Sequence, residues 1–199
     1  MEPVIETNMG ITFIFILAVA WFFLRKFSAN PFNKMLKLAS TGDAKAQYDI
    51  GYLYYQGKQV KRNYERAFNW FDTAAKQGNV RAMVALAGLY NEGKGCKKAP
   101  EKAFRYYEEA AKKGDFEARV NLAVCYLKGI GTQKDEVRAA KILKSAADEK
   151  SPLAQTLLAD LYDRGVGVEK NEEEALRYYL LAAKQGEPIA KKKLAVLKK

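Results

Sequence analysis

The stretch Gly78–Lys113, GNVRAMVALAGLYNEGKGCKKAPEKAFRYYEEAAKK, recurs along the chain at an offset of 36 residues. Its alanine, tyrosine and glycine positions coincide with those of the segments on either side. The coincident sets are Ala46/Ala82/Ala118/Ala154/Ala190, Tyr54/Tyr90/Tyr126/Tyr162, Gly57/Gly93/Gly129/Gly165 and Ala67/Ala103/Ala139/Ala175. A fixed period of about 20–50 residues is typical of a repeat array, in which each unit packs against its neighbours. The sequence therefore predicts a repeat protein.

Each unit is predicted to form two helices. The first helix begins after a residue whose side-chain oxygen can accept a hydrogen bond from a free backbone N–H, namely Asp43, Asn79, Asp115 or Ser151. The second begins near Asn63, Pro100, Asp135 or Asn171, and proline suits a first helical position. Loops such as Gly93-Lys-Gly95 join the two helices. Gln59 replaces the second loop glycine of the first unit, and Lys150 replaces the glycine that closes the third.

The repeats are framed by two partial units. A short tail (residues 1–9) and an apolar segment (10–27) precede a capping half-repeat at 28–41. Four helix-pair repeats follow at 42–185, and a second half-repeat covers 186–199. The lysines of this last segment give it the polar outer face that a terminal repeat needs. We expect ten helices after the apolar segment.

The repeated residues resemble the Sel-one-like repeat, a relative of the tetratricopeptide repeat. In the first unit the pattern is carried by Ala46, Gly51, Tyr54, Gly57, Ala67, Trp70, Ala74, Ala75 and Gly78. The resemblance implies an all-α fold, a right-handed α-solenoid of antiparallel helix pairs with a concave face. It also implies protein–protein interaction as an adaptor or scaffold.

The segment 10–27 is predicted to be a transmembrane anchor. No charge occurs from Thr7 to Leu24, which is about the minimum length for a membrane-spanning helix. A cleaved signal peptide would need a basic start, and this tail has Glu2 and Glu6 instead. Positive charge at Arg25 and after it favours a repeat domain on the cytoplasmic side, at a bacterial inner membrane. The alternative is a periplasmic or secreted repeat domain.

The composition of the chain excludes or disfavours several classes of function. The net charge of +11 would suit nucleic acid, but the array has no long basic run, so a nucleic-acid partner is not expected. The chain has no histidine, which excludes Ser/His and Cys/His nucleophile arrangements. Cys96 and Cys125 are predicted to be free thiols, with a bridge between them left open. We predict no catalytic residue, cofactor, metal or small-molecule substrate.

Specificity must lie in positions that do not repeat. On the first helix of each unit, the face away from Ala46 and Ile50 is predicted to line the concave surface. The candidate partner-binding residues are Tyr48, Tyr52, Tyr55, Val84, Asn91, Val124, Leu127, Asp160 and Asp163. They form a surface that is aromatic at one end, apolar in the middle and acidic at the other, which suits capture of a peptide or helix. The alternative is that some of them pack against a neighbouring helix.

Two non-enzymatic functions remain. The first is a membrane-anchored adaptor or scaffold that binds a protein partner on the concave face. The second is an immunity-type inhibitor that neutralises a toxin or effector by direct binding.

Overall fold

The computed structural model describes residues 15–17, 19 and 30–197. Residues 30–197 form ten helices, as the repeat pattern predicts. The helices are α2 (Pro31–Ser40), α3 (Ala44–Gln56), α4 (Tyr64–Lys76), α5 (Val80–Glu92), α6 (Pro100–Lys112), α7 (Phe116–Lys128), α8 (Glu136–Asp148), α9 (Pro152–Arg164), α10 (Glu172–Lys184) and α11 (Pro188–Leu197).

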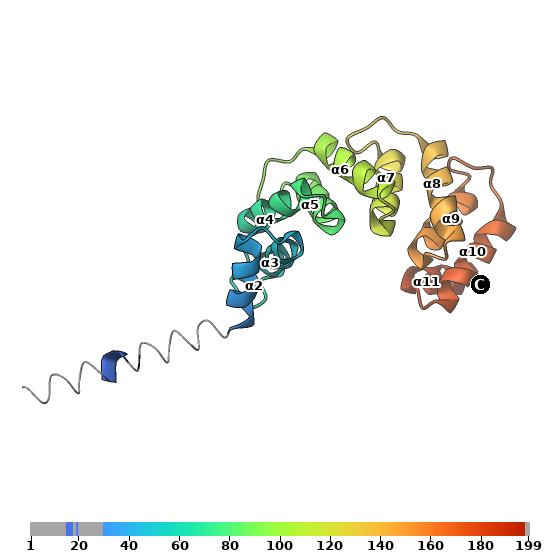
Figure 1. Cartoon of the computed structure of the whole chain (residues 1–199). Coiled ribbons are helices and arrows are strands. Elements are labelled where there is room, and N and C mark those ends of the chain that lie inside the picture. The colour runs from blue at the N-terminus through green and yellow to red at the C-terminus, as the bar shows by residue number, and fades with distance from the viewer. Residues whose placement is uncertain (1–14, 18, 20–29, 198–199) are drawn as a thin grey trace, which may run out of the picture.

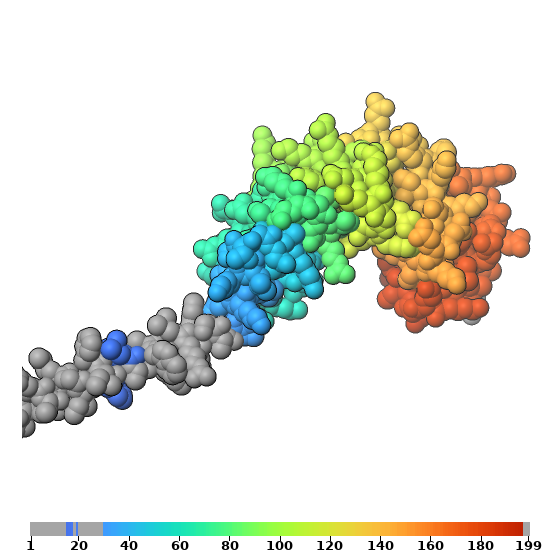
Figure 2. Space-filling model, viewed as in Figure 1, coloured from blue at the N-terminus to red at the C-terminus, as the bar shows by residue number. Residues whose placement is uncertain are grey.

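The helices form an all-helical solenoid bent into an arc (Figure 1). Each helix packs against the helix before it and the helix after it in the chain. The first helices of the units, α3, α5, α7 and α9, lie with α11 on the inner side of the arc, and α4, α6, α8 and α10 lie on the outer side. Figure 2 shows the same arc as a solid surface hollowed on its inner side. This inner side is the concave face.

The predicted caps set the helix starts. Asp43, Asn79 and Asp115 accept hydrogen bonds from the backbone N–H three residues later, at 2.6, 3.0 and 2.8 Å. Ser151 makes the same contact at 3.3 Å. Each bond satisfies one of the N–H groups that a helix start leaves free. At α6, Ala99 provides no side-chain cap, and Pro100 occupies the first turn as predicted.

Alanine side chains form the contacts between successive helices. The alanines aligned with Ala46 and with Ala67 are all 6% exposed or less, and most are fully buried. A methyl group lets two helix backbones approach closely, whereas a larger side chain at the same place would have to displace a neighbour. The large side chains of the core, such as Phe71, Leu86 and Leu143, fill the space between these contacts.

Glycine is required at the second glycine position of the loop because the backbone there contacts the preceding unit closely. Gly95, Gly131 and Gly167 have φ near 70°, and a Cβ on each would overlap the main chain at the start of the previous outer helix. In the first unit the aligned residue is Gln59, which takes the same left-handed conformation, with φ of 62°, and is exposed. The helix that precedes this unit, α2, begins at Pro31, behind the N-cap Asn30.

Lys150 also adopts the conformation of the glycine that it replaces. Its φ is 67°, in the left-handed region that costs a residue with a side chain about 1–2 kcal/mol. The aligned Gly78, Gly114 and Gly186 have φ of 85–96°. The repeat geometry therefore overrides the local preference of lysine at this turn.

The predicted anchor at residues 10–27 lies outside the described residues, apart from Phe15, Ile16, Leu17 and Val19. These four are helical and are 37–69% exposed. In the part of the chain that the structure describes, no helix is long and apolar enough to cross a membrane.

Candidate functional site

A hollow of about 490 Å³ opens on the concave face between α3, α5 and α7. We call it the concave groove. The inner helices supply most of its lining, and the outer helices α4 and α6 contribute one aromatic side chain each. The lining residues are Tyr48, Tyr52, Tyr55, Phe71, Arg81, Val84, Ala85, Gly88, Leu89, Glu92, Tyr107, Asp115, Glu117 and Asn121.

Three tyrosines of α3 form one wall of the groove. The Tyr48 and Tyr52 rings stack with centroids 6.0 Å apart, and the Tyr52 and Tyr55 rings stack at 6.4 Å. Tyr48 also rests against Phe71, with the centroids 5.7 Å apart. Tyr52 is 41% exposed. The structure thus brings together the three predicted aromatic residues, and it leaves the middle ring most open to solvent.

Gly88 makes the hollow. It lies inside α5, aligned with Tyr52, Val124 and Asp160 of the other units. Its φ is not in the left-handed region, and a Cβ there would meet nothing closer than the Tyr107 hydroxyl at 3.8 Å. Neither backbone geometry nor packing therefore requires glycine, although glycine within a helix costs about 1 kcal/mol relative to alanine. The missing side chain leaves open space in the groove.

The candidate Val84 is part of the floor. It lines the groove but is only 8% exposed, because it also packs into the core. Asn91, Val124 and Leu127 are half-buried and are not among the lining residues. Leu127 packs against the core, as the alternative interpretation of these positions allows. The three remain predictions as partner contacts.

The groove has polar residues that the repeat pattern does not single out. Tyr107 of α6 is aligned with Phe71, Leu143 and Tyr179, which are all core residues, so periodicity alone assigns it to the core. Its ring is buried, but its hydroxyl lies beside Gly88 in the groove. Glu117, Glu92 and Arg81 join the capping residue Asp115 in the charged lining. They lie near helix ends, where charged residues are common, and their sequence positions carry no signal for a site.

Two tyrosine hydroxyls of the groove have raised pKa values. For Tyr107, burial is the largest cause of the raised pKa, and the carboxylates of Glu117 and Glu92 add to the effect. Burial likewise raises the pKa of Tyr48, with Glu117 among the smaller causes. Both hydroxyls therefore stay protonated at neutral pH. Glu117 lies within electrostatic range of both.

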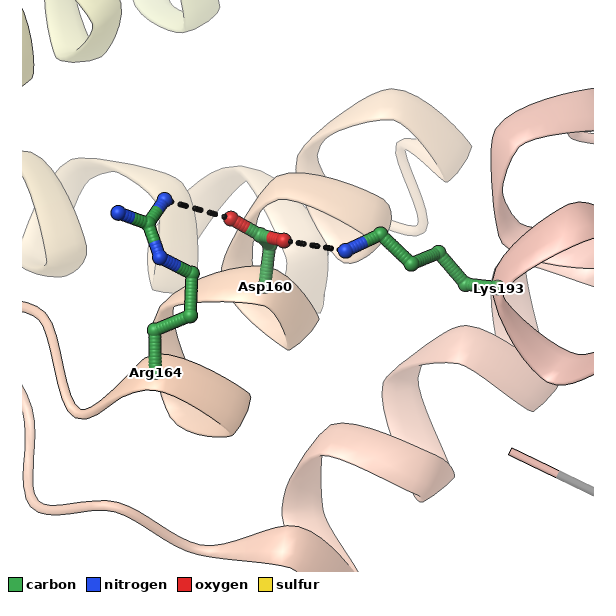
Figure 3. Close-up of polar contacts among 3 residues, drawn as sticks. All are labelled: Asp160, Arg164 and Lys193. Atoms are coloured by element: carbon green, nitrogen blue, oxygen red, sulfur yellow. Dashed lines mark hydrogen bonds and ion pairs between the residues drawn. The ribbon is translucent and has the colours of Figure 1, made fainter. Parts of the chain in front are cut away.

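The acidic candidates lie at the other end of the concave face. Asp160 of α9 accepts hydrogen bonds from Lys193 of α11 at 2.8 Å and from Arg164 at 3.1 Å (Figure 3). Burial alone would raise the pKa of Asp160, but the two cations outweigh it and lower that pKa. The Asp160 charge is therefore already paired within the chain, and it holds the last helix against α9. Asp163 forms no ion pair with another described residue.

The other chemical groups to consider among the described residues are metal ligands and thiols. Within residues 30–197, no group of three or more His, Cys, Asp or Glu side chains could hold a metal ion. Cys96 and Cys125 are free thiols, as the interpretation without a bridge predicts. Burial raises the pKa of the Cys125 thiol to about 11, so this thiol is protonated and unreactive at neutral pH.

The geometry is that of an α-solenoid repeat protein with a groove on its concave face. The Sel1 repeat model matches residues 44–79, 80–115, 116–151 and 152–187. The chain belongs to the Sel1 repeat family, which confirms the family resemblance of the sequence.

Two solved structures of similar sequence have the same fold. A Sel1 repeat protein from Oxalobacter formigenes is 33% identical with a TM-score of 0.79, over 83% of this chain and 66% of the other. A protective antigen of uropathogenic Escherichia coli with an SLR fold is 32% identical with a TM-score of 0.78, over 83% of this chain. The chain spans only 36% of that antigen. A search of curated proteins finds no match.

Replacing Gly88 by alanine should raise the free energy of unfolding by about 1 kcal/mol, because the methyl group fits and the helix gains a better helix former. Thermal unfolding of the full chain measures this. Gly51→Ala is the matched control, since its Cβ would lie 2.8 Å from the buried Phe71 ring and should destabilise the fold. A loss of stability in Gly88→Ala would show that Gly88 has a structural role.

Replacing Asp160 by asparagine should lower the free energy of unfolding at pH 7 by about 1 kcal/mol, the scale of a partly exposed ion pair. Because the folded-state pKa of Asp160 is lowered, its contribution is present at neutral pH and is lost as the pH falls below about 4 through that pKa. Urea unfolding of both proteins at pH 7 and pH 3 should therefore show a smaller difference at pH 3 than at pH 7. Asp163→Asn is the control, and an equal effect in both variants would contradict the assignment.

Proposed function

We propose that the protein is a non-enzymatic adaptor whose concave groove binds a segment of a protein partner. The observation that carries this proposal is the groove itself: an unfilled hollow on the inner side of a Sel1 solenoid, walled by three stacked tyrosines. Tyrosine supplies a large apolar contact together with a hydroxyl, and it is enriched among the residues that dominate binding energy.

Two features of the groove come from residues that the fold does not need. The repeated alanines and large apolar residues are buried in the core, whereas Tyr52 is exposed and Gly88 is free of backbone or packing constraint. A volume of about 490 Å³ lies in the range of pockets that enclose a bound group. It admits side chains that project from a partner. These features support capture of a segment over contact with a flat surface.

The membrane anchor is the second part of the proposal. The apolar segment at residues 10–27, with acidic residues before it and basic residues after it, would hold the groove at the cytoplasmic face of a bacterial inner membrane. The described residues Phe15, Ile16 and Leu17 are helical, apolar and exposed, as a lipid-facing helix would be.

The anchor and its orientation can be tested by labelling. We expect a cysteine placed at the exposed Glu173, in a Cys96→Ser background, to resist a membrane-impermeant maleimide in intact cells and to react after lysis. The protein should also stay with the membrane after an alkaline carbonate wash. Labelling in intact cells would reverse the orientation, and release by carbonate would remove the anchor from the proposal.

The binding role can be tested by capture of the partner from membranes. We expect Tyr52→Ala to weaken capture by about tenfold or more, because an exposed aromatic anchor of the interface is lost, with little change in thermal stability. Leu176→Ala is the control, since Leu176 is 43% exposed on the outer helix α10. Equal capture by the natural protein, Tyr52→Ala and Leu176→Ala would place the interface elsewhere. A captured toxin that loses activity on binding would make the protein an inhibitor.

A further inference from the structure

The concave groove is locally acidic in a chain whose net charge is +11. Its charged lining consists of three carboxylates, Glu92, Asp115 and Glu117, and one cation, Arg81. Asp115 caps α7, and Glu92 is paired with Lys94. Glu117 has neither a hydrogen bond nor an ion pair with another described residue. The groove therefore holds an uncompensated negative charge.

Tyr107 gives independent evidence for a polar ligand. Its side chain is only 8% exposed, yet its hydroxyl lines the groove beside Gly88. Within residues 30–197, no group hydrogen-bonds to this hydroxyl. The hydroxyl opens into the groove, so a polar group of a ligand can reach it there. The hydroxyl and the Glu117 carboxylate are both free to accept a hydrogen bond from a bound group.

The aromatic wall adds a surface that attracts cations. Elsewhere in the chain, basic groups lie over tyrosine rings: Arg66 over Tyr54, Lys102 over Tyr90 and Arg138 over Tyr126, at 5.5, 5.3 and 5.1 Å from the ring centroids. Among the described residues, no cation lies over the groove tyrosines Tyr48, Tyr52, Tyr55 or Tyr107. Tyrosine faces next to an unpaired carboxylate are a favourable environment for a cation.

We propose that the groove binds an arginine side chain presented by the protein partner. This inference rests on the proposed function, and it names the partner's chemistry. The guanidinium is planar, so it can stack on the Tyr52 ring and donate at the same time to the Glu117 carboxylate and the Tyr107 hydroxyl. The space left by Gly88 admits the end of the side chain. A lysine ammonium, a compact and strongly hydrated charge, satisfies fewer of these contacts.

The test begins with a selection from a display library of random peptides on the full-length protein in detergent, with Tyr52→Ala as the counter-selection. We expect arginine to be enriched at one position of the selected peptides. The best peptide and its copy with that arginine changed to glutamine are then compared by calorimetry, and the copy should bind about tenfold more weakly, as expected for the loss of a charge-assisted contact.

Variants of the protein locate the contact. Glu117→Gln should reduce affinity for the arginine peptide by about tenfold and make binding less sensitive to salt. Tyr107→Phe should reduce it several-fold without changing thermal stability, because the hydroxyl has no partner to lose. Arg81→Gln is the opposite-sign comparison, which removes a positive charge from the same groove and should tighten binding.

The outcomes separate the two proposals. Peptides that depend on Tyr52 but carry no arginine, or bind equally to Glu117→Gln, would overturn the arginine inference and leave the groove as a binding site. If every peptide that binds the natural protein also binds Tyr52→Ala, so that none survives the counter-selection, the proposed function itself is contradicted.

Discussion

The close packing of alanine between successive helices is the constraint on which the structure depends. Each helix of the array buries small side chains such as Ala67, Ala74 and Ala82 against its neighbours. Because these small buried side chains let neighbouring helices approach closely in every unit, the units stack by a similar step, and repetition of that step gives the arc. The loop glycines act on the same spacing, since Gly95, Gly131 and Gly167 let each loop touch the outer helix of the preceding unit. Lys150 adopts the left-handed conformation of the glycine that it replaces, so the spacing between units outweighs the backbone preference of lysine.

Because the buried alanines and the loop glycines determine the stacking, the residues of the concave face are free to differ between units. The aligned positions Tyr52, Gly88, Val124 and Asp160 occupy equivalent places on the inner helices and have no property in common. In the first three units they give an aromatic wall, a hollow and an apolar surface. In the fourth, Asp160 binds Lys193 and fastens the terminal helix. One inner position thus lines the groove at one end of the arc and closes the array at the other.

Periodicity predicts most of the fold. The ten helices, the caps at Asp43, Asn79, Asp115 and Ser151, and the left-handed turns all follow from residue types at fixed offsets, because they depend on local physics. The site is harder to predict. The tyrosines of α3 stand out because they do not repeat. Tyr107 is aligned with core residues, and only the three-dimensional structure shows that its hydroxyl lies in the groove beside Gly88. The pairing of Asp160 with Lys193 depends on how α9 and α11 approach, which no repeat offset supplies. The anchor at residues 10–27 stays a prediction.

The central claim is that the concave groove, and not the outer surface, contacts the partner. Photo-crosslinking in living cells tests it most directly, with a photoreactive phenylalanine placed at Tyr52 in the groove or at Leu176 on the outer helix α10. The account predicts a discrete crosslinked species from position 52, lost when Glu117 is also changed to glutamine, and none from position 176. Crosslinks from position 176 alone, or the same products from both positions, would contradict it.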